Sequence, residues 1–511
     1  MTTRREALGL MATSALTSAA VPLRAAETAP KSLALWDLFE THDALGLATL
    51  VRRGEVSPLE LLEAAIARCD SVDEQLNAVP LRHEALAREW AATVDRAAPF
   101  AGVPFLLKDL GVGLAGTITS AGSRFFADAR ASIDSEIVRR YRKAGLVIFG
   151  KTASPELGLT GTTESLLHGA TRNPWNLART VGGSSGGAAA VVAARVVPIA
   201  HASDGGGSIR TPASCCGVFG LKPSRGRMPL GPLRFEGWNG LTIQHAVSMT
   251  VRDNAALLDA TAGAEPGSPY VAPTPARSFL DETRVAPGRL RIALIESPPS
   301  AAPVDPEVLA ALNEVGEWLT RLGHEVETAR FPIDHASTNQ GMIDTLMVSA
   351  RKALEDRARE LGRAVTAEDV ELVTWSFYEG ATTVGGLAYA RAREAFDRAG
   401  YDMARFHEKF DVILTPTLAK PPVEIGTLSL SPSSLEVFVN NITGFGPFTA
   451  IYNMTGQPAM SVPLASTRDG LPIGMMFAAA YGQEALLYRL AAQLEAERPW
   501  RSRRAPHAVP L

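Results

Sequence analysis

The sequence is poor in the features that mark several large classes of protein. Cysteine is scarce, because only Cys69, Cys215 and Cys216 occur in 511 residues, and two of them are adjacent. Adjacent cysteines almost never bridge, so we exclude a disulfide framework. Charge of one sign is lacking too, since 50 basic residues stand against 54 acidic ones and the formal net charge is −4. This balance offers no basic face to a phosphate backbone, which excludes nucleic acid as a partner.

Long hydrophobic runs are also missing after the first residues. No later run reaches the roughly 18 apolar residues of a membrane-spanning helix, so we expect no membrane contact in the mature protein. Residues 1–26 differ, because the pair Arg4-Arg5 precedes a weakly apolar run and small residues. The pattern predicts a secretory signal peptide of the twin-arginine type, and a disordered basic N-terminus is the alternative. We therefore expect a periplasmic or secreted protein in which residues 27–511 form one domain.

What the sequence does contain is an alternation of helix and strand patterns. Ser57 to Glu60 has the form of a capping box with proline at the first helical position, and predicts a helix that runs through Cys69. Further helices are expected at 134–144, 188–195 and 305–323, and strands at 101–108, 146–149, 196–202, 290–294, 324–331 and 411–417, with a hairpin at 461–477. This alternation predicts the α/β class.

One phosphate-loop match is misleading. Residues 145–152, GLVIFGKT, satisfy the pattern G-x-x-x-x-G-K-[ST]. A phosphate loop needs a small-residue turn whose amides face the phosphate, whereas the residues between these glycines have the pattern of a strand. We therefore do not expect nucleotide binding, and we interpret Lys151 as a surface or strand-end lysine.

A glycine-rich stretch, residues 181–210, holds two serines with glycine neighbours, Ser184 and Ser208. An expected strand before Ser208 runs into the glycines 205–207. A strand that ends in this way places a serine hydroxyl beside unobstructed backbone N–H groups. Ser208 is therefore a candidate nucleophile, and the N–H groups of Gly205, Gly206, Gly207 and Ser208 are candidate donors to an oxyanion.

Ser184 allows a different interpretation. Residues 182–186, GGSSG, fit the G-x-S-x-G nucleophile elbow of α/β-hydrolases, which needs a strand before the serine, and an acid and a histidine after it. We interpret the preceding residues 172–180 as a polar loop, and the later histidines have no motif context. A serine esterase that uses Ser184 is therefore kept as an alternative.

Ser208 needs a base before it can act as a nucleophile. A buried lysine can serve, because burial lowers the pKa of its amine. Lys108 follows the apolar run Phe105-Leu106-Leu107 and is the candidate.

Three separated segments together resemble the amidase signature family: GVPFLLKD at 102–109, VGGSSGG at 181–187 and DGGGSIRTPASCCGVFGLKP at 204–223. The resemblance continues through DVILTPT and YNMTGQPAMSVPL, so it covers nearly all of residues 27–511. It implies a single domain with a central mixed β-sheet covered by helices on both faces. It also implies a triad in which Ser208 is the nucleophile, Ser184 a bridging serine after a cis peptide bond, and Lys108 the base.

The resemblance implies an amidase that hydrolyses a carboxamide C–N bond through an acyl-enzyme on Ser208, with no metal or cofactor. Ser203 and Gly205 depart from the family's commoner residues. This variant is similar to the subgroup that acts on linear or cyclic amides such as the 6-aminohexanoate cyclic dimer. Asp204 and Arg210 are interpreted as scaffold for the glycine loop.

Two alternatives from other classes stay open. One is a protein like the amidotransferase A subunit, although the predicted signal and the acidic balance of charge disfavour it. The other is a non-catalytic exported binding protein. The expected partner of the amidase is a small-molecule amide, a homodimer is one possible assembly, and Trp238, Trp375 and Tyr378 are candidate pocket residues.

Overall fold

The structure is a computed structural model and describes residues 35–510. The predicted signal peptide, residues 1–26, lies outside them. The strands are β1 Leu81–Arg82, β2 Pro104–Lys108, β3 Val147–Thr152, β4 Glu164–Ser165, β5 Gly169–Ala170, β6 Arg172–Asn173, β7 Asn176–Thr180, β8 Ile199–Asp204, β9 Phe219–Lys222, β10 Ile243–Ser248, β11 Arg291–Leu294, β12 Glu325–Thr328, β13 Val412–Pro416, β14 Ala459–Ser466 and β15 Pro472–Ala479.

The α-helices are α2 Trp36–Thr41, α3 Ala44–Arg53, α4 Pro58–Leu76, α5 Glu84–Ala91, α6 Glu136–Lys143, α7 Gly186–Ala193, α8 Arg210–Cys216, α9 Val251–Thr261, α10 Phe279–Glu282, α11 Pro306–Arg321, α12 His335–Leu361, α13 Leu372–Gly380, α14 Gly386–Phe406, α15 Leu435–Phe445, α16 Ile451–Met454 and α17 Glu484–Glu497. No helix among residues 35–510 is long and apolar enough to span a membrane.

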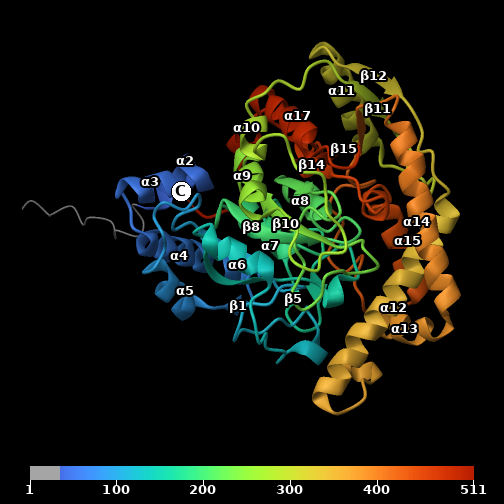
Figure 1. Ribbon diagram of the computed structural model, residues 1–511, viewed down its shortest axis with the longest axis horizontal. Coiled ribbons are helices and arrows are strands. Elements are labelled where there is room, and N and C mark those ends of the chain that lie inside the picture. Colours follow the sequence, from blue (N-terminus) through green and yellow to red (C-terminus); the bar gives the residue numbers. More distant parts are fainter. Residues whose placement is uncertain (1–34, 511) are drawn as a thin grey trace, which may run out of the picture.

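The centre of the fold is a mixed eight-stranded sheet in the order β12-β11-β13-β15-β14-β9-β10-β8. Figure 1 labels six of these strands, β8, β10, β11, β12, β14 and β15. Within this sheet, β11 pairs in parallel with β12 and with β13. All other neighbouring strands of the sheet pair antiparallel. A second sheet has the order β1-β3-β2, and its β2 contacts β8, the edge strand of the large sheet. The expected α/β class with a mixed sheet is confirmed.

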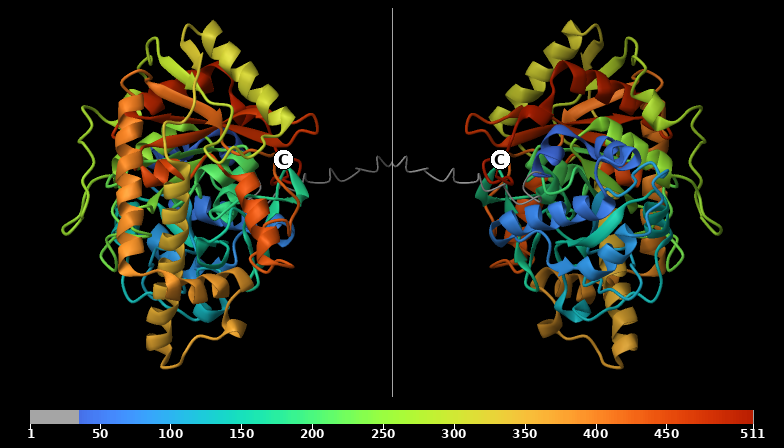
Figure 2. Two further views of the ribbon diagram at one scale, coloured as in Figure 1. Left: turned by 90° about the vertical axis from the view of Figure 1, so that its right-hand side faces the viewer. Right: turned by 90° about the vertical axis from the view of Figure 1, so that its left-hand side faces the viewer.

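Helices cover both faces of the large sheet. Successive side chains of its strands point to opposite faces, and apolar side chains on each face pack against helices. Leu414 of β13 packs into one hydrophobic cluster together with residues of α9, α11 and α17. Its neighbour Ile413 packs into another cluster with residues of α14 and α16. In Figure 1 the N-terminal helices α2 to α5 lie on one side of the molecule and α12 to α14 on the other. Figure 2 shows α12 and α14, which pack against each other, from the side.

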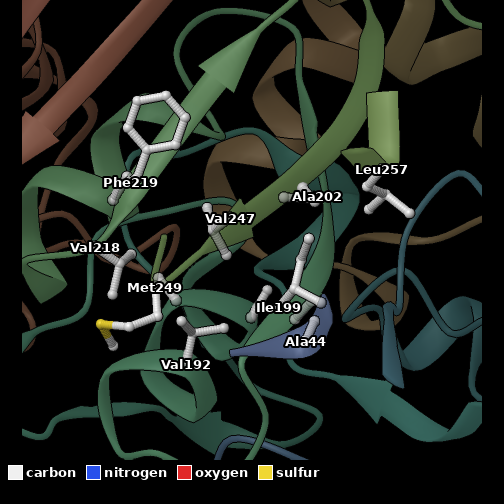
Figure 3. Close-up of a cluster of buried hydrophobic side chains, with 14 of the residues drawn as sticks. Ala44, Val192, Ile199, Ala202, Val218, Phe219, Val247, Met249 and Leu257 are labelled. Carbon is white, nitrogen blue, oxygen red and sulfur yellow. The ribbon is translucent and has the colours of Figure 1, made fainter. Parts of the chain in front are cut away.

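Part of the hydrophobic core surrounds β8, the strand of the glycine-rich stretch. Ile199 and Ala202 of β8 pack with Val247 of β10, Val192 of α7 and Phe219 of β9 (Figure 3). All five are fully or almost fully buried. Burial of each such apolar side chain contributes about 1.5–3 kcal/mol, with alanine at the low end or below it. The strand that leads into the glycine loop is therefore fixed by close packing.

Most of the predicted elements are confirmed, with shifted ends. The capping box at Ser57 forms, and its helix α4 runs on to Leu76. The unit β11-α11-β12 and the hairpin β14-β15 are present. The strand expected at 196–202 lies at Ile199–Asp204, because Pro198 and the turn after α7 take up its first residues.

The phosphate-loop match is a strand, as expected, since β3 covers residues 147–152. Lys151 lies near the end of this strand, as one of the two interpretations has it, but the other, that it is a surface lysine, is wrong. Its side chain is buried, and Nζ donates to the carbonyl of Ile118 and to Thr119 Oγ1 at 2.5 and 2.6 Å. The three cysteines are buried free thiols, so the expected lack of disulfides is confirmed for them.

Candidate active site

Three elements bring the predicted site residues to one region. Lys108 is the last residue of β2, Ser184 lies in the turn before α7, and Ser208 lies between β8 and α8. The Nζ atom of Lys108 donates to Ser184 Oγ at 2.7 Å. The backbone N–H of Ser185 donates to the carbonyl of Ser208 at 3.3 Å, which ties the two serine segments together. Ser208 itself is partly exposed and lines a cavity.

Lys108 is shielded from solvent. Its side chain is fully buried, and Nζ makes a second hydrogen bond to Ser203 Oγ at 3.0 Å. Burial lowers the pKa of Lys108 to about 7, against the attraction of Asp204, which raises it. The amine is therefore neutral in a large fraction of molecules near neutral pH, which the role of a base requires.

The turn that carries Ser184 is shaped by close backbone contacts. The Gly183–Ser184 peptide bond is cis. A Cβ added to Gly183 would lie 2.1 Å from the carbonyl oxygen of Thr162, so only glycine fits at this position. Thr163 Oγ1 donates to the carbonyl of Gly182 at 2.9 Å and accepts the N–H of Gly186 at 3.1 Å. The turn is thus held on both sides of Ser184.

A reciprocal pair of hydrogen bonds joins this turn to β8. Ser185 Oγ donates to the carbonyl of Ser203 at 3.1 Å, and the N–H of Ser203 donates to Ser185 Oγ at 3.2 Å. Sequence reasoning did not assign a role to Ser185 or to the hydroxyl of Ser203. The only signal available was their position next to Ser184 and Asp204.

The glycine loop after β8 is held by a buried ion pair. Asp204 accepts two hydrogen bonds from the guanidinium of Arg210, at 3.0 and 2.9 Å, and neither side chain is exposed. The carboxylate also accepts the N–H groups of Gly207 and Ile209, at 2.7 and 3.1 Å. Burial acts to raise the pKa of Asp204, but the charge and hydrogen bonds of Arg210, the charge of Lys222 and the hydrogen bond of Asn453 together hold this pKa below its usual range. This geometry supports the scaffold interpretation of both residues.

The expected set of oxyanion donors needs one correction. The N–H of Gly207 already donates to the Asp204 carboxylate. Its inclusion among the donors to the oxyanion is therefore wrong. Within residues 35–510, the N–H groups of Gly205, Gly206 and Ser208 donate to no protein acceptor. The backbone of Gly207 has a φ of 136°, a value that residues with a side chain rarely adopt.

A cavity of about 480 Å³ opens beside Ser208. Its lining is mostly apolar and comes from segments far apart in the chain, chiefly α12, α13 and α15. Among the described residues that line it, His335 is the only one with a titratable side chain. The apolar side chains of this lining include Leu159, Trp238, Ile333, Met342, Ile343, Leu346, Met347, Val373, Phe377, Leu435, Phe438, Val439, Ile442, Phe445, Ile451 and Met454.

Of the three aromatic candidates, only Trp238 reaches this cavity. Trp375 and Tyr378 stack on each other, with ring centroids 5.1 Å apart. Their neighbours Ser376 and Phe377 line the cavity instead. The periodicity of α13 alone does not reveal which of its faces meets α12 and which meets the cavity.

The segment before Ser184 differs from the polar loop that was expected there. Residues 172–180 are not a loop, because β6 and β7 form a two-stranded hairpin there. A strand therefore does precede Ser184, but it belongs to this small hairpin and not to the central sheet. The side chain that contacts Ser184 Oγ is a lysine and not a histidine. Among residues 35–510, no group of three or more His, Cys, Asp or Glu side chains is placed to hold a metal ion.

Ser208 lies beside free N–H donors, and a buried lysine contacts the neighbouring Ser184. This is the arrangement that a serine hydrolase with an amine base would require. The comparisons with known proteins agree with this class. The model of the Amidase family matches residues 60–488. The chain is 40% identical over 478 residues to a 6-aminohexanoate-cyclic-dimer hydrolase of Paenarthrobacter ureafaciens, covering 91% of this chain and 96% of the relative.

Solved structures show the same likeness. A 6-aminohexanoate cyclic dimer hydrolase complexed with substrate has a TM-score of 0.87 at 39% identity, covering 92% of this chain and 99% of that one. A bacterial aryl acylamidase of the amidase signature family has a TM-score of 0.82 at 27% identity, with coverage of 92% and 99%. The chain belongs to the amidase signature family, and it is an amide hydrolase that acts on carbon–nitrogen bonds other than peptide bonds.

Proposed function

We propose that Ser208 is the acylated nucleophile, Ser184 the proton relay and Lys108 the base of this amidase. The observation that carries the proposal is the contact of the buried Lys108 amine with Ser184 Oγ, beside a cavity that Ser208 lines. A neutral amine has one lone pair and two N–H groups. Nζ then donates to Ser203 Oγ and accepts the proton of Ser184, while Ser184 Oγ accepts the proton of Ser208.

In the first half of the reaction, Ser208 Oγ forms a bond to the amide carbonyl carbon and its proton passes through Ser184 to Lys108. The negative oxygen of the tetrahedral intermediate accepts the N–H groups of Gly205, Gly206 and Ser208. The C–N bond then breaks as the proton returns to the leaving nitrogen. The amine departs when the substrate is a linear amide, and it stays attached to the acyl group when the substrate is a ring. Water attacks the acyl-enzyme in the second half and releases the carboxylic acid.

We infer that the substrate is an uncharged amide with large apolar parts. Among the described residues, 35–510, no Asp, Glu, Lys or Arg side chain lines the cavity to pair with a charge, and burial of an unpaired charge is costly. The cyclic dimer named for the relative meets this condition, because ring closure removes both the ammonium and the carboxylate end. A linear dimer with free ends carries both charges and does not.

Hydrolysis of matched substrates tests this function. The purified enzyme is expected to hydrolyse the cyclic 6-aminohexanoate dimer at least about tenfold faster, in kcat/KM, than its linear zwitterion, which corresponds to about 1.4 kcal/mol. An open-chain dimer with both ends capped as neutral amides separates charge from shape, and is expected to approach the cyclic compound. Equal rates on the charged and capped linear dimers would contradict the inference about the substrate. Full activity of a Ser208→Ala variant would contradict the proposed nucleophile.

We also propose that the enzyme is exported through its twin-arginine-type signal. The support is the pattern of residues 1–26, with Arg4-Arg5 before a weakly apolar run. Fusion of these residues to a reporter that is active only after export tests this, and the pair of changes Arg4→Lys and Arg5→Lys is expected to retain the reporter in the cytoplasm. A homodimer stays a prediction that the mass of the purified protein in solution decides.

A further inference from the structure

His201 lies beneath the segment that carries the base. It is on β8, it is fully buried, and its Nδ1 accepts the backbone N–H of Lys108 at 3.1 Å. The contact joins the edge strand of the large sheet to β2 of the small one, at the place where the two sheets meet. A histidine side chain therefore supplies the acceptor that a neighbouring strand would otherwise supply to this N–H.

The second ring nitrogen continues the chain of hydrogen bonds. Because Nδ1 accepts, the proton of the neutral ring is on Nε2, which lies 3.0 Å from Oε1 of Gln244 on β10. This contact sets the orientation of the amide, and Gln244 Nε2 donates to the carbonyl of Gly111 at 3.3 Å. The two side chains together hold the N–H of Lys108 and the carbonyl of Gly111, the two ends of a four-residue segment.

The ring of His201 has little freedom to leave this position. It contacts the ring of Tyr141, whose centroid is 5.8 Å away, and Tyr141 packs against Phe105 of β2. Burial lowers the pKa of His201 to about 3, and the nearby charges of Lys108, His245 and Lys151 act in the same direction, against the hydrogen bond of Gln244. The ring is therefore neutral across the pH range in which amide hydrolysis is measured, and Nδ1 stays an acceptor.

We propose that His201 and Gln244 are positioning residues that hold the Lys108 amine on Ser184 Oγ. Neither side chain lines the substrate cavity, so their effect on the reaction runs through the backbone of residues 108–111. This inference rests on the proposed function, because it takes Lys108 as the base. A displacement of about 1 Å between reacting groups costs on the order of 100-fold in rate.

The test compares His201→Phe with His201→Asn and with a matched control. Phenylalanine keeps a ring but removes both nitrogens, whereas the Oδ1 of asparagine takes the place of Nδ1 as acceptor. His245 is a second fully buried histidine on the adjacent strand, and its Nε2 contacts Asn254 and Tyr488, away from Lys108. His245→Phe therefore reports the cost of losing a buried histidine without touching the base.

The kcat of His201→Phe is expected to fall at least about tenfold with KM unchanged, since binding is not affected. His201→Asn is expected to regain at least about threefold of that loss, although it leaves a larger void in the core. His245→Phe is expected to keep its kcat while its Tm falls. Gln244→Met, which removes the bond to Gly111, is expected to lower kcat to an intermediate value and serves if His201→Phe does not fold.

A kcat of folded His201→Phe or Gln244→Met within about twofold of the wild type would overturn the proposal. Equal losses of kcat in His201→Phe and His245→Phe at equal Tm would also overturn it, because they would indicate a general loss of core stability. Lys108→Ala separates this inference from the proposed function. If Lys108→Ala is active, the proposed function fails; if it is inactive and His201→Phe is fully active, only the positioning role fails.

Discussion

The indole of Trp238 occupies the space that a side chain at position 205 would need. A Cβ built on Gly205 would lie 2.6 Å from Cε3 of Trp238 and 2.7 Å from Cζ3. Trp238 lines the cavity beside Ser208, so the absence of a side chain at Gly205 lets an aromatic ring reach the reaction centre. The departure of Gly205 from the family's commoner residue thus has a structural counterpart in this chain.

The first prediction concerns this pair. Gly205→Ala is expected to lower kcat/KM by at least about tenfold. The added methyl group overpacks this site at a cost of about 1–3 kcal/mol, and either the indole ring moves into the cavity or the glycine loop shifts. The backbone at Gly205 is not in the left-handed region, so the added methyl group acts through Trp238 and not through φ. A double-mutant cycle with Trp238→Ala checks this. The loss caused by Gly205→Ala is expected to shrink in the Trp238→Ala background, and an unchanged loss would contradict the contact.

The second prediction concerns Ser203, whose hydroxyl accepts the other hydrogen bond of the Lys108 amine. Ser203→Ala removes the acceptor that orients the Lys108 amine. The kcat is expected to fall about two- to thirteenfold, which corresponds to the loss of one hydrogen bond worth 0.5–1.5 kcal/mol. Ser203→Thr keeps the hydroxyl and is expected to retain most of the activity. Steady-state kinetics on one substrate measure both. Similar activities of the alanine and threonine variants would exclude an orienting role.

The third prediction is a pH profile. The base acts only when it is deprotonated, and the pKa of Lys108 is lowered to about 7 by burial. The value of kcat/KM is therefore expected to rise with pH and to level off above pH 7, and to fall tenfold per unit well below it. An uncharged substrate keeps the profile specific to the enzyme. A flat profile between pH 5 and 9 would indicate that no group with this pKa controls the reaction.

Local pattern marks the three candidate catalytic residues in the sequence, because Lys108 ends an apolar strand and Ser184 and Ser208 have glycine neighbours. Their roles as base, relay and nucleophile are what the resemblance to the amidase signature family implies. The contacts of Ser203 and His201 with Lys108 were not visible, because each joins positions more than 90 residues apart through two sheets. The ring of Trp238 was named only as a candidate, since its contact with Gly205 depends on the loop between β9 and β10.

Two features of the structure, the hairpin β6-β7 and the burial of Lys151, differ from the predictions for physical reasons. The hairpin β6-β7 was missed because most of its residues are polar or half exposed, and so it lacks the apolar alternation of a core strand. Lys151 was interpreted as a surface or strand-end lysine, and its burial was not predicted because a lysine is rarely buried. In the structure, the carbonyl of Ile118 and the hydroxyl of Thr119 compensate its burial.

The fourth prediction concerns stability. Asp204→Asn leaves Arg210 charged, buried and without its carboxylate, and is expected to lower the free energy of unfolding by about 3–5 kcal/mol. Glu408→Gln is a matched control, because Glu408 pairs with Arg405 on the surface with both side chains about 60% exposed. The control is expected to change stability by less than about 1 kcal/mol. Urea denaturation measures both, and equal small effects would contradict the anchoring role of Asp204.

The assignment of the three catalytic residues is tested most directly by a fluorophosphonate probe, which labels only an activated serine, followed by mass-spectrometric mapping of the adduct. In the wild-type enzyme the adduct is expected on Ser208. In Lys108→Ala the labelling of Ser208 is expected to disappear, and in His245→Phe it is expected to persist. An adduct on Ser184 would contradict the assignment, and so would labelling of Ser208 that does not depend on Lys108.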